Sequence, residues 1–535
     1  MEVVFLPINH KIIVNPGENL FHAAREHGID LGGVCSGGKT CGKCKVLITK
    51  GNTSPLIKEE LDTLTKEEIN KGIRLACCFS CIQDTCVILL GTNKNNSYVK
   101  SVDQVKENMK HHSDDVIKID SNSYEPNRSY GVAIDIGTTT VAAKLLDINN
   151  KQVLSEKSES NPQYLYGMDV ISRITFGSKN AKNADILCNV IRNCCNGIIN
   201  QMVGESEINP KNIKSIVVVG NTTMIHIFLK RPLNGLLKVP FLNIDYNGVE
   251  YKASDLGFME YKNALLYALP GIHGHVGSDT MGCIIEKNMN KIEGTTLLVD
   301  IGTNGEIVLA RDGNIMVCST AAGPAFEGAT LQQGMVAKDG AITTVRIIGN
   351  KISVDYIGSN NENSYPIGIC GSGVLEALAE FYTYGYMDST GRLQGQYGED
   401  NYVTLYEDDY HKVMLTQKDI REIQLAKGAI YAGIMLLLNN SGINMDEVDR
   451  IYLAGAFGSK VSYEKVVKIG LLPNVNIDKI ESIGNAALSG AIRYLLGDIS
   501  KEEIKVIAAN CCYLELATNE AFNETFINSI SFPEI

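Results

Sequence analysis

The chain contains one short pattern twice, and this repeat constrains its fold more than any other feature. The segment VAIDIGTTTVAAKLLD (132–147) matches LLVDIGTNGEIVLARD (297–312). In each copy an apolar run predicts a buried strand, Asp-Ile-Gly-Thr leads into a polar turn, and a second apolar run predicts another strand. A pattern that recurs at this length indicates a duplicated structural unit.

Two further pairs of segments support the duplication. SIVVVGNTTMIHIFL (215–229) matches RIYLAGAFGSKVS (450–462), and GIHGHVGSDTMGCII (271–285) matches ESIGNAALSGAIRYLL (481–496) more loosely. The three elements follow one another in the same order in both halves. We therefore predict two homologous α/β lobes, at 129–294 and 295–535.

The turn between the two strands of each copy is suited to binding phosphate. Its residues direct backbone N–H groups and short polar side chains to one point, which makes an anion pocket. They are Gly137, Thr138 and Thr139 in the first copy and Gly302, Thr303 and Asn304 in the second. Asp135 and Asp300 precede the turns and can hold Mg²⁺ through water. Two such turns in register predict a clamp that binds ATP from both sides.

Cysteines are concentrated near the N-terminus, where seven of the fifteen lie between Cys35 and Cys86. In a chain of 535 residues without an export signal, such a local cluster indicates metal or redox chemistry in a reducing cytoplasm. The candidate ligands have the spacing Cys-x5-Cys-x2-Cys and a fourth member in GIRLACC. They are Cys35, Cys41, Cys44 and Cys77. Glycines among them allow the backbone to wrap a cluster closely.

Residues 1–91 resemble a β-grasp [2Fe–2S] ferredoxin domain, including the Arg-Leu-Ala-Cys context of the fourth cysteine. The ligand loop is one residue longer than the plant-type Cys-x4-Cys-x2-Cys. Zinc ligation is the alternative for these cysteines. Cys78 could replace Cys77 as the fourth ligand; otherwise Cys78, Cys81 and Cys86 are interpreted as ordinary thiols. Residues 92–128 are polar with weak apolar periodicity and predict a mobile connector.

The duplicated half, over about 130–500, resembles the superfamily of acetate kinase, sugar kinases, Hsp70 and actin. The resemblance implies that Gly455 and Gly458 in LAGAFG belong to the adenosine motif. It also implies that Lys427 in QLAKGAI contacts adenine or ribose. Asp279 in GSDTMG corresponds to an acid that orients Mg²⁺ and water, although a helix cap would explain it equally well.

The expected catalytic acids are therefore Asp135, Asp279 and Asp300, and Glu306 is a further candidate for the metal shell. The predicted fold class is α+β and α/β multidomain. An N-terminal β-grasp ferredoxin domain precedes a duplicated two-lobed ATPase fold of the actin-like and Hsp70-like type.

The two halves together resemble the reductive activators of corrinoid proteins. Motifs that the wider superfamily lacks add to this likeness, namely NPQYLYGMDVISRI (161–174), STAAGPAFEGA (319–329), GICGSGVLEAL (368–378) and AKGAIYAGI (426–434). Asn161 in the first of them could simply cap a helix. The glycines of GICGSG could begin a helix or contact nucleotide.

This likeness implies a specific activity, the ATP-dependent return of inactive Co(II) to Co(I) in a corrinoid protein. The implied cofactors are a [2Fe–2S] cluster, ATP and Mg²⁺. The implied partners are a corrinoid protein of a methyltransferase system and a low-potential electron donor, with a homodimer as the expected assembly. We expect a cytoplasmic location.

Three other functions fit parts of the sequence. An activator of 2-hydroxyacyl-CoA dehydratases resembles the ATPase half, but its cluster is held by cysteines on the lobes. A small-molecule kinase fused to a ferredoxin would need a catalytic base beyond the aspartates already named. A non-catalytic scaffold would have no use for a redox centre. The net charge of −12 disfavours nucleic acid as a partner, and we find no apolar run long enough to span a membrane.

Overall fold

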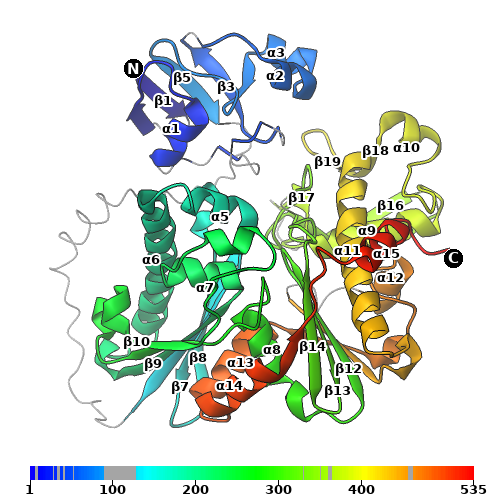
Figure 1. Cartoon of the computed structure of the whole chain (residues 1–535). Coiled ribbons are helices and arrows are strands. Elements are labelled where there is room, and N and C mark those ends of the chain that lie inside the picture. Colours follow the sequence, from blue (N-terminus) through cyan, green and yellow to red (C-terminus); the bar gives the residue numbers. More distant parts are fainter. Residues whose placement is uncertain are drawn as a thin grey trace. The chain divides into compact units, whose positions relative to one another are not determined.

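A computed structural model represents the whole chain (Figure 1). It describes residues 1–6, 10–27, 29, 31–32, 37–39, 42–51, 53–89, 128–328, 330–349, 351–359, 364–455 and 462–534. The connector predicted at 92–128 lies outside these residues, except for Arg128. Contacts divide the chain into two compact parts, Met1–Asn127 with Pro162–Phe176, and Arg128–Asn161 with Gly177–Ile535.

The first part contains a mixed sheet with the strand order β2-β1-β5-β3-β4 among its described residues. Its elements are β1 (Glu2–Leu6), β2 (His10–Ile13), α1 (Leu20–Glu26), β3 (Lys45–Lys50), α2 (Lys58–Thr63), α3 (Lys66–Asn70), β4 (Ile73–Leu75) and β5 (Thr85–Leu89). The central strands β1 and β5 run parallel, and the other pairs are antiparallel. Val3 and Phe5 alternate toward the core, where α1 buries Leu20. This arrangement is the predicted β-grasp fold.

The second part contains two sheets whose five shared strands follow the same order. The first sheet is β10-β11-β9-β6-β7-β8 and the second is β21-β20-β12-β13-β14-β22. The strands of the first are β6 (Tyr130–Ile136), β7 (Thr140–Asp147), β8 (Gln152–Ser160), β9 (Ile213–Gly220), β10 (Val249–Lys252) and β11 (Leu265–Ala268). Those of the second are β12 (Thr295–Ile301), β13 (Gly305–Arg311), β14 (Asn314–Thr320), β20 (Arg450–Ala454), β21 (Ile480–Gly484) and β22 (Cys511–Tyr513).

The repeated sequence segments occupy equivalent places in these sheets. The hairpins β6–β7 and β12–β13 are antiparallel, while β9 and β20 run parallel to the first strand of their hairpin. The next strands, β11 and β21, extend the sheets in parallel. The structure thus has the duplicated two-lobed fold that the sequence predicts.

Helix α5 (Val170–Gly177) belongs, except for its last residue, to the first part. In the second part, helices cover the outer faces of the two large sheets and fill the space between them (Figure 1). The helices of the second part are α6 (Ala181–Glu205), α7 (Thr222–Phe228), α8 (Ser278–Glu286), α9 (Gly371–Thr383), α10 (Gly395–Asp400), α11 (Gln417–Asn440), α12 (Tyr463–Lys468), α13 (Ala486–Leu495), α14 (Lys501–Asn510) and α15 (Glu520–Ser529). Of these, α8 and α13 lie together between the sheets, and their apolar side chains join both sheets in one core. This core fixes the inner edges of the lobes, where the repeated turns lie.

Smaller sheets extend the second lobe. They contain β15 (Ala341–Ile348), β16 (Lys351–Tyr356) and β17 (Gly368–Ile369), and β18 (Tyr402–Glu407) with β19 (Lys412–Thr416). A large core beneath them also buries apolar residues of α9 and α11. None of the helices in the described chain combines the length and apolarity that a membrane span requires.

Candidate functional site

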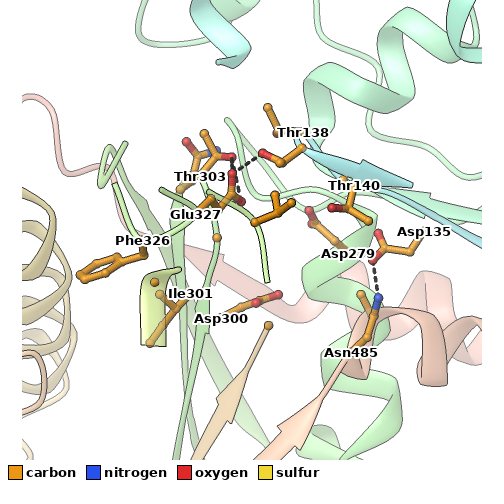
Figure 2. A pocket seen from close by; sticks show the side chains of 18 of the residues that line it. Asp135, Thr138, Thr140, Asp279, Asp300, Ile301, Thr303, Phe326, Glu327 and Asn485 are labelled. Carbon is orange, nitrogen blue, oxygen red and sulfur yellow. Dashed lines mark hydrogen bonds between the residues drawn. The ribbon is translucent and has the colours of Figure 1, made fainter. Parts of the chain in front are cut away.

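A cavity of about 450 Å³ lies between the two lobes of the second part, at the repeated turns (Figure 2). Eleven of the residues predicted as site residues line it. They are Asp135, Gly137, Thr138, Thr139, Asp279, Asp300, Gly302, Thr303, Asn304, Glu306 and Gly455. The structure therefore brings together residues that are more than 300 positions apart in the chain.

The first turn connects β6 to β7 and is supported by two asparagines. The Asn161 side chain donates to the Gly137 carbonyl at 2.8 Å, and its backbone N–H donates to the Thr139 carbonyl at 2.7 Å. The Asn221 amide donates to the Thr138 hydroxyl at 2.9 Å and also caps α7. Asn161 is fully buried, so it supports the turn directly. Neither asparagine was identified from the sequence as part of the site.

The second turn connects β12 to β13 and packs against Gly455, the residue that follows β20. The Gly302 N–H donates to the Asn304 carbonyl at 3.0 Å, which closes the turn. Gly455 has a φ of +92°, and a Cβ atom there would lie 2.6 Å from the Ile301 carbonyl oxygen and 3.0 Å from Asp300 Oδ1. Only glycine allows this close approach. Gly458, in the same motif, lies outside the described residues.

Five carboxylates line the cavity, namely those of Asp135, Asp279, Asp300, Glu306 and Glu327. Burial and the Asp300 charge raise the pKa of Asp279 to about 8. Burial likewise raises the pKa of Asp135 to about 7 and that of Asp300 to about 6. The pKa of Glu306 is raised well above its usual range by burial and by its acidic neighbours. Each shift arises because a carboxylate is enclosed by protein among other negative charges, which a bound cation would compensate.

Each lobe also contributes a donor to the aspartate of the other. Asn485, at the start of α13, donates to Asp135 Oδ2 at 2.7 Å. The Cys283 thiol on α8 donates to Asp300 Oδ2 at 3.8 Å. These contacts connect the two lobes beside the cavity. They follow from the duplication, because α8 and α13 each follow the last parallel strand of their own lobe.

The N-terminus of α9 also opens on the cavity. Cys370, Gly371 and Ser372 line it, and no side chain caps the first N–H groups of the helix. The glycines of GICGSG therefore begin a helix, as one of the two interpretations expected. The helix dipole and the uncapped N–H groups favour an anion at this end.

Lys427 does not lie in the cavity, contrary to the expectation that it contacts adenine or ribose. It is buried on α11, where its ammonium donates to the carbonyls of Ser529 and Ser531, both at 2.7 Å. The ring of Phe532 lies 5.0 Å from it. Burial lowers the pKa of Lys427 to about 7. Its position on α11 directs it to the C-terminal segment, which it holds in place.

The described part of the ferredoxin-type domain brings two of the predicted cluster ligands together. The Sγ atoms of Cys44 and Cys77 are 3.3 Å apart, and both side chains are buried. Cys78 Sγ lies 3.7 Å from Cys77 Sγ. Cys35 and Cys41 lie outside the described residues. The side chains of Cys44 and Cys77 are therefore in contact, and that of Cys78 lies beside Cys77.

A buried ion pair supports the strand that leads to Cys77. Both oxygens of Glu60 accept from Arg74, on β4, at 2.7 Å, and Oε1 also accepts from the Leu75 N–H at 3.1 Å. Arg74 further donates to Thr53 Oγ1 at 2.7 Å. A bidentate pair of this kind fixes the orientation of both side chains. It therefore fixes the end of β4, which lies two residues before Cys77.

Three family models together match most of the chain. Their descriptions and ranges are the 2Fe-2S iron-sulfur cluster binding domain (4–81), the RACo middle region (130–292) and the C-terminal domain of RACo, the ASKHA domain (294–535). The first match supports a [2Fe–2S] cluster in this protein, and the last suggests ATP binding. Both agree with the fold class expected from the sequence.

Three relatives cover three quarters of the chain or more. The corrinoid activation enzyme RamQ of Eubacterium limosum is 35% identical over 75% of this chain and 70% of its own. The [Co(II) methylated amine-specific corrinoid protein] reductase of Methanosarcina barkeri is 26% identical over 75% and 77%. A solved structure described as a reductive activator for a corrinoid, iron-sulfur protein aligns over 99% of this chain and 98% of its own, with 27% identity and a TM-score of 0.70. The chain therefore belongs to the family of reductive activators of corrinoid proteins.

Proposed function

We propose that this protein uses ATP to return the Co(II) of a corrinoid protein to Co(I), with an electron supplied through its [2Fe–2S] cluster. The observation that carries the proposal is the combination within one chain. A ferredoxin-type domain with adjacent buried cysteines is joined to two lobes whose phosphate-type turns face one cavity. The solved structure that aligns over 99% of this chain is described as a reductive activator for a corrinoid, iron-sulfur protein. Two further relatives, which each cover 75% of the chain, are named as a corrinoid activation enzyme and a corrinoid protein reductase.

The cavity fits MgATP by its chemistry. The two turns and the start of α9 offer N–H and hydroxyl donors for phosphates, while the carboxylates offer a place for a divalent cation. Among the described residues, no three acidic, histidine or cysteine side chains are close enough to ligate one ion directly. Asp135, Asp279 and Asp300 would therefore hold Mg²⁺ through water, and Asp279 would also orient the attacking water.

The cysteines fit an iron–sulfur cluster. The Sγ atoms of Cys44 and Cys77 are 3.3 Å apart and buried, so both thiolates can bind one iron atom of a cluster with little movement. We propose Cys35 and Cys41 as the other two ligands. When bound, the cluster supplies a one-electron donor of low potential. The Glu60–Arg74 pair would keep Cys77 oriented toward it.

The remaining parts of the proposal concern the setting of the reaction. A low-potential reductant would supply the electron, and the protein would act in the cytoplasm, where thiols stay reduced. We also propose a homodimer. ATP would contribute by binding between the two lobes, and the ATP-bound arrangement of the lobes would favour the corrinoid-bound state through differential binding.

The test is ATP hydrolysis by the full-length, cluster-loaded protein with and without a Co(II) corrinoid protein. We expect the partner to stimulate hydrolysis several-fold. Asp300→Asn should lose hydrolysis but retain the cluster absorbance. Cys77→Ser should lose the absorbance but retain basal hydrolysis. Hydrolysis that Asp300→Asn leaves intact would contradict the assignment of the cavity.

A further inference from the structure

The carboxylate of Glu327 lies between the two phosphate-type turns (Figure 2). It accepts a hydrogen bond from the Thr139 hydroxyl of the first turn. It also accepts from the Thr303 hydroxyl of the second turn, at 3.1 Å to Oε1 and 3.0 Å to Oε2. A single negative group thus joins the first lobe to the second at the point where their turns converge.

A packed turn presents this carboxylate. Phe326, the preceding residue, is buried in the core of the second lobe. The Glu327 N–H donates to the Pro324 carbonyl at 3.2 Å. On the other side, a Cβ atom on Gly334 would lie 2.1 Å from the Gly328 carbonyl oxygen, so the two backbones are in contact. The position of Glu327 is therefore fixed by its neighbours on both sides.

The chemistry of this position matches that of a phosphate. A carboxylate and a phosphate both carry negative charge and both accept hydrogen bonds from hydroxyl groups. The Glu327 charge also contributes to raising the pKa of Asp300, so the carboxylate lies in an already acidic cavity. A phosphate between the turns and the carboxylate of Glu327 would compete for the same hydroxyls and repel each other.

We propose that Glu327 is an internal substitute for the terminal phosphates of the nucleotide, which holds the lobes together until ATP displaces it. The inference rests on the proposed ATP site. Only molecules in which Glu327 has left the turns can bind the terminal phosphates. The apparent affinity for ATP is therefore the intrinsic affinity multiplied by the fraction of such molecules. Removal of the carboxylate increases ATP affinity, whereas removal of an ordinary binding residue would decrease it.

The test measures nucleotide affinity of the full-length protein by calorimetry for Glu327→Ala and Glu327→Gln. Glu399→Gln is the matched control, because Glu399 is exposed and does not line the cavity. We expect the dissociation constant for ATP to fall about tenfold in Glu327→Ala, equivalent to about 1.4 kcal/mol, and by less in Glu327→Gln. AMP, which lacks the terminal phosphates, should bind all variants equally.

Unchanged or weaker ATP binding in Glu327→Gln would overturn the inference, as would an equal gain for AMP. Weaker binding only in the presence of Mg²⁺ would also overturn it and would make Glu327 a metal ligand instead. If Glu327→Ala does not fold, Glu327→Gln carries the test, since it preserves the shape of the side chain. Wild-type protein that binds no ATP at all would defeat the proposed function itself.

Discussion

The close contact of Gly455 with the second turn gives a prediction whose magnitude follows from the structure. In Gly455→Ala, the positive φ costs about 1–2 kcal/mol. The new Cβ atom would also lie 2.6 Å from the Ile301 carbonyl oxygen, where an ordinary contact begins at 3.4 Å. The backbone beside Asp300 must therefore move by about 0.8 Å. A displacement of about 1 Å in a catalytic site can reduce the rate by about 100-fold.

Gly442→Ala is the matched control for this variant. Gly442 also has a positive φ, +63°, but a Cβ atom there meets nothing within 4 Å. Both variants should lower the thermal midpoint, because both place alanine in the left-handed region. Only Gly455→Ala should lower kcat/KM for ATP, by about 10- to 100-fold. Equal ATP kinetics in the two variants would refute the idea that this contact positions the Asp300 turn.

Three other predictions test separate parts of the molecule. Lys427→Met should leave ATP affinity unchanged but should speed proteolysis of the C-terminal segment, because Lys427 contacts Ser529 and Ser531. Weaker ATP binding in this variant would instead support a contact between Lys427 and the nucleotide. The free energy of unfolding of the metal-free protein should fall as the pH rises from about 4 to about 8. The reason is that the raised pKa of Asp279, about 8, makes the folded chain bind more protons than the unfolded chain in that range. Mg²⁺ should weaken this dependence of the thermal midpoint on pH. A thermal midpoint that rises with pH in metal-free protein would contradict the burial of Asp279. After anaerobic reconstitution, Cys77→Ser should lack cluster absorbance and Cys78→Ser should keep it; the reverse result would exchange their roles.

Local chemistry explains why the two turns could be predicted. Asp-Ile-Gly-Thr between apolar runs specifies a strand, a turn and a strand from neighbouring residues alone, and its repetition predicts the second lobe. The spacing of Cys35, Cys41 and Cys44 is informative for the same reason. In both cases the signal lies within a few residues of the group that it predicts.

The residues that sequence reasoning missed depend on contacts between distant segments. Asn161, Asn221 and Asn485 each follow a strand and look like ordinary helix caps or loop residues. Their contacts with Asp135 and the first turn arise only when the sheets are assembled. Glu327 lies in STAAGPAFEGA, a motif that the sequence analysis tied to the family but to no site, since a single acid in a loop can face solvent or a neighbouring lobe.

The position of Lys427, away from the cavity, has a related cause. A lysine on a long helix can project in any direction around the axis, and the packing of α11 against α15 determines which one it takes. The C-terminal segment supplies two carbonyl acceptors there, which a lysine in a buried position requires. The choice between Cys77 and Cys78 stays open for a simpler reason, because residues next to each other in the sequence share every local signal.

The most direct test of the central claim is the appearance of Co(I) in a corrinoid protein. The full-length protein would be loaded with its cluster, reduced anaerobically and mixed with a Co(II) corrinoid protein, with Co(I) followed by its absorption. The account predicts that Co(I) forms with wild-type protein and MgATP, and fails to form without ATP or with Asp300→Asn or Cys77→Ser. Co(I) formation that is equally fast without ATP, or with Cys77→Ser, would contradict it.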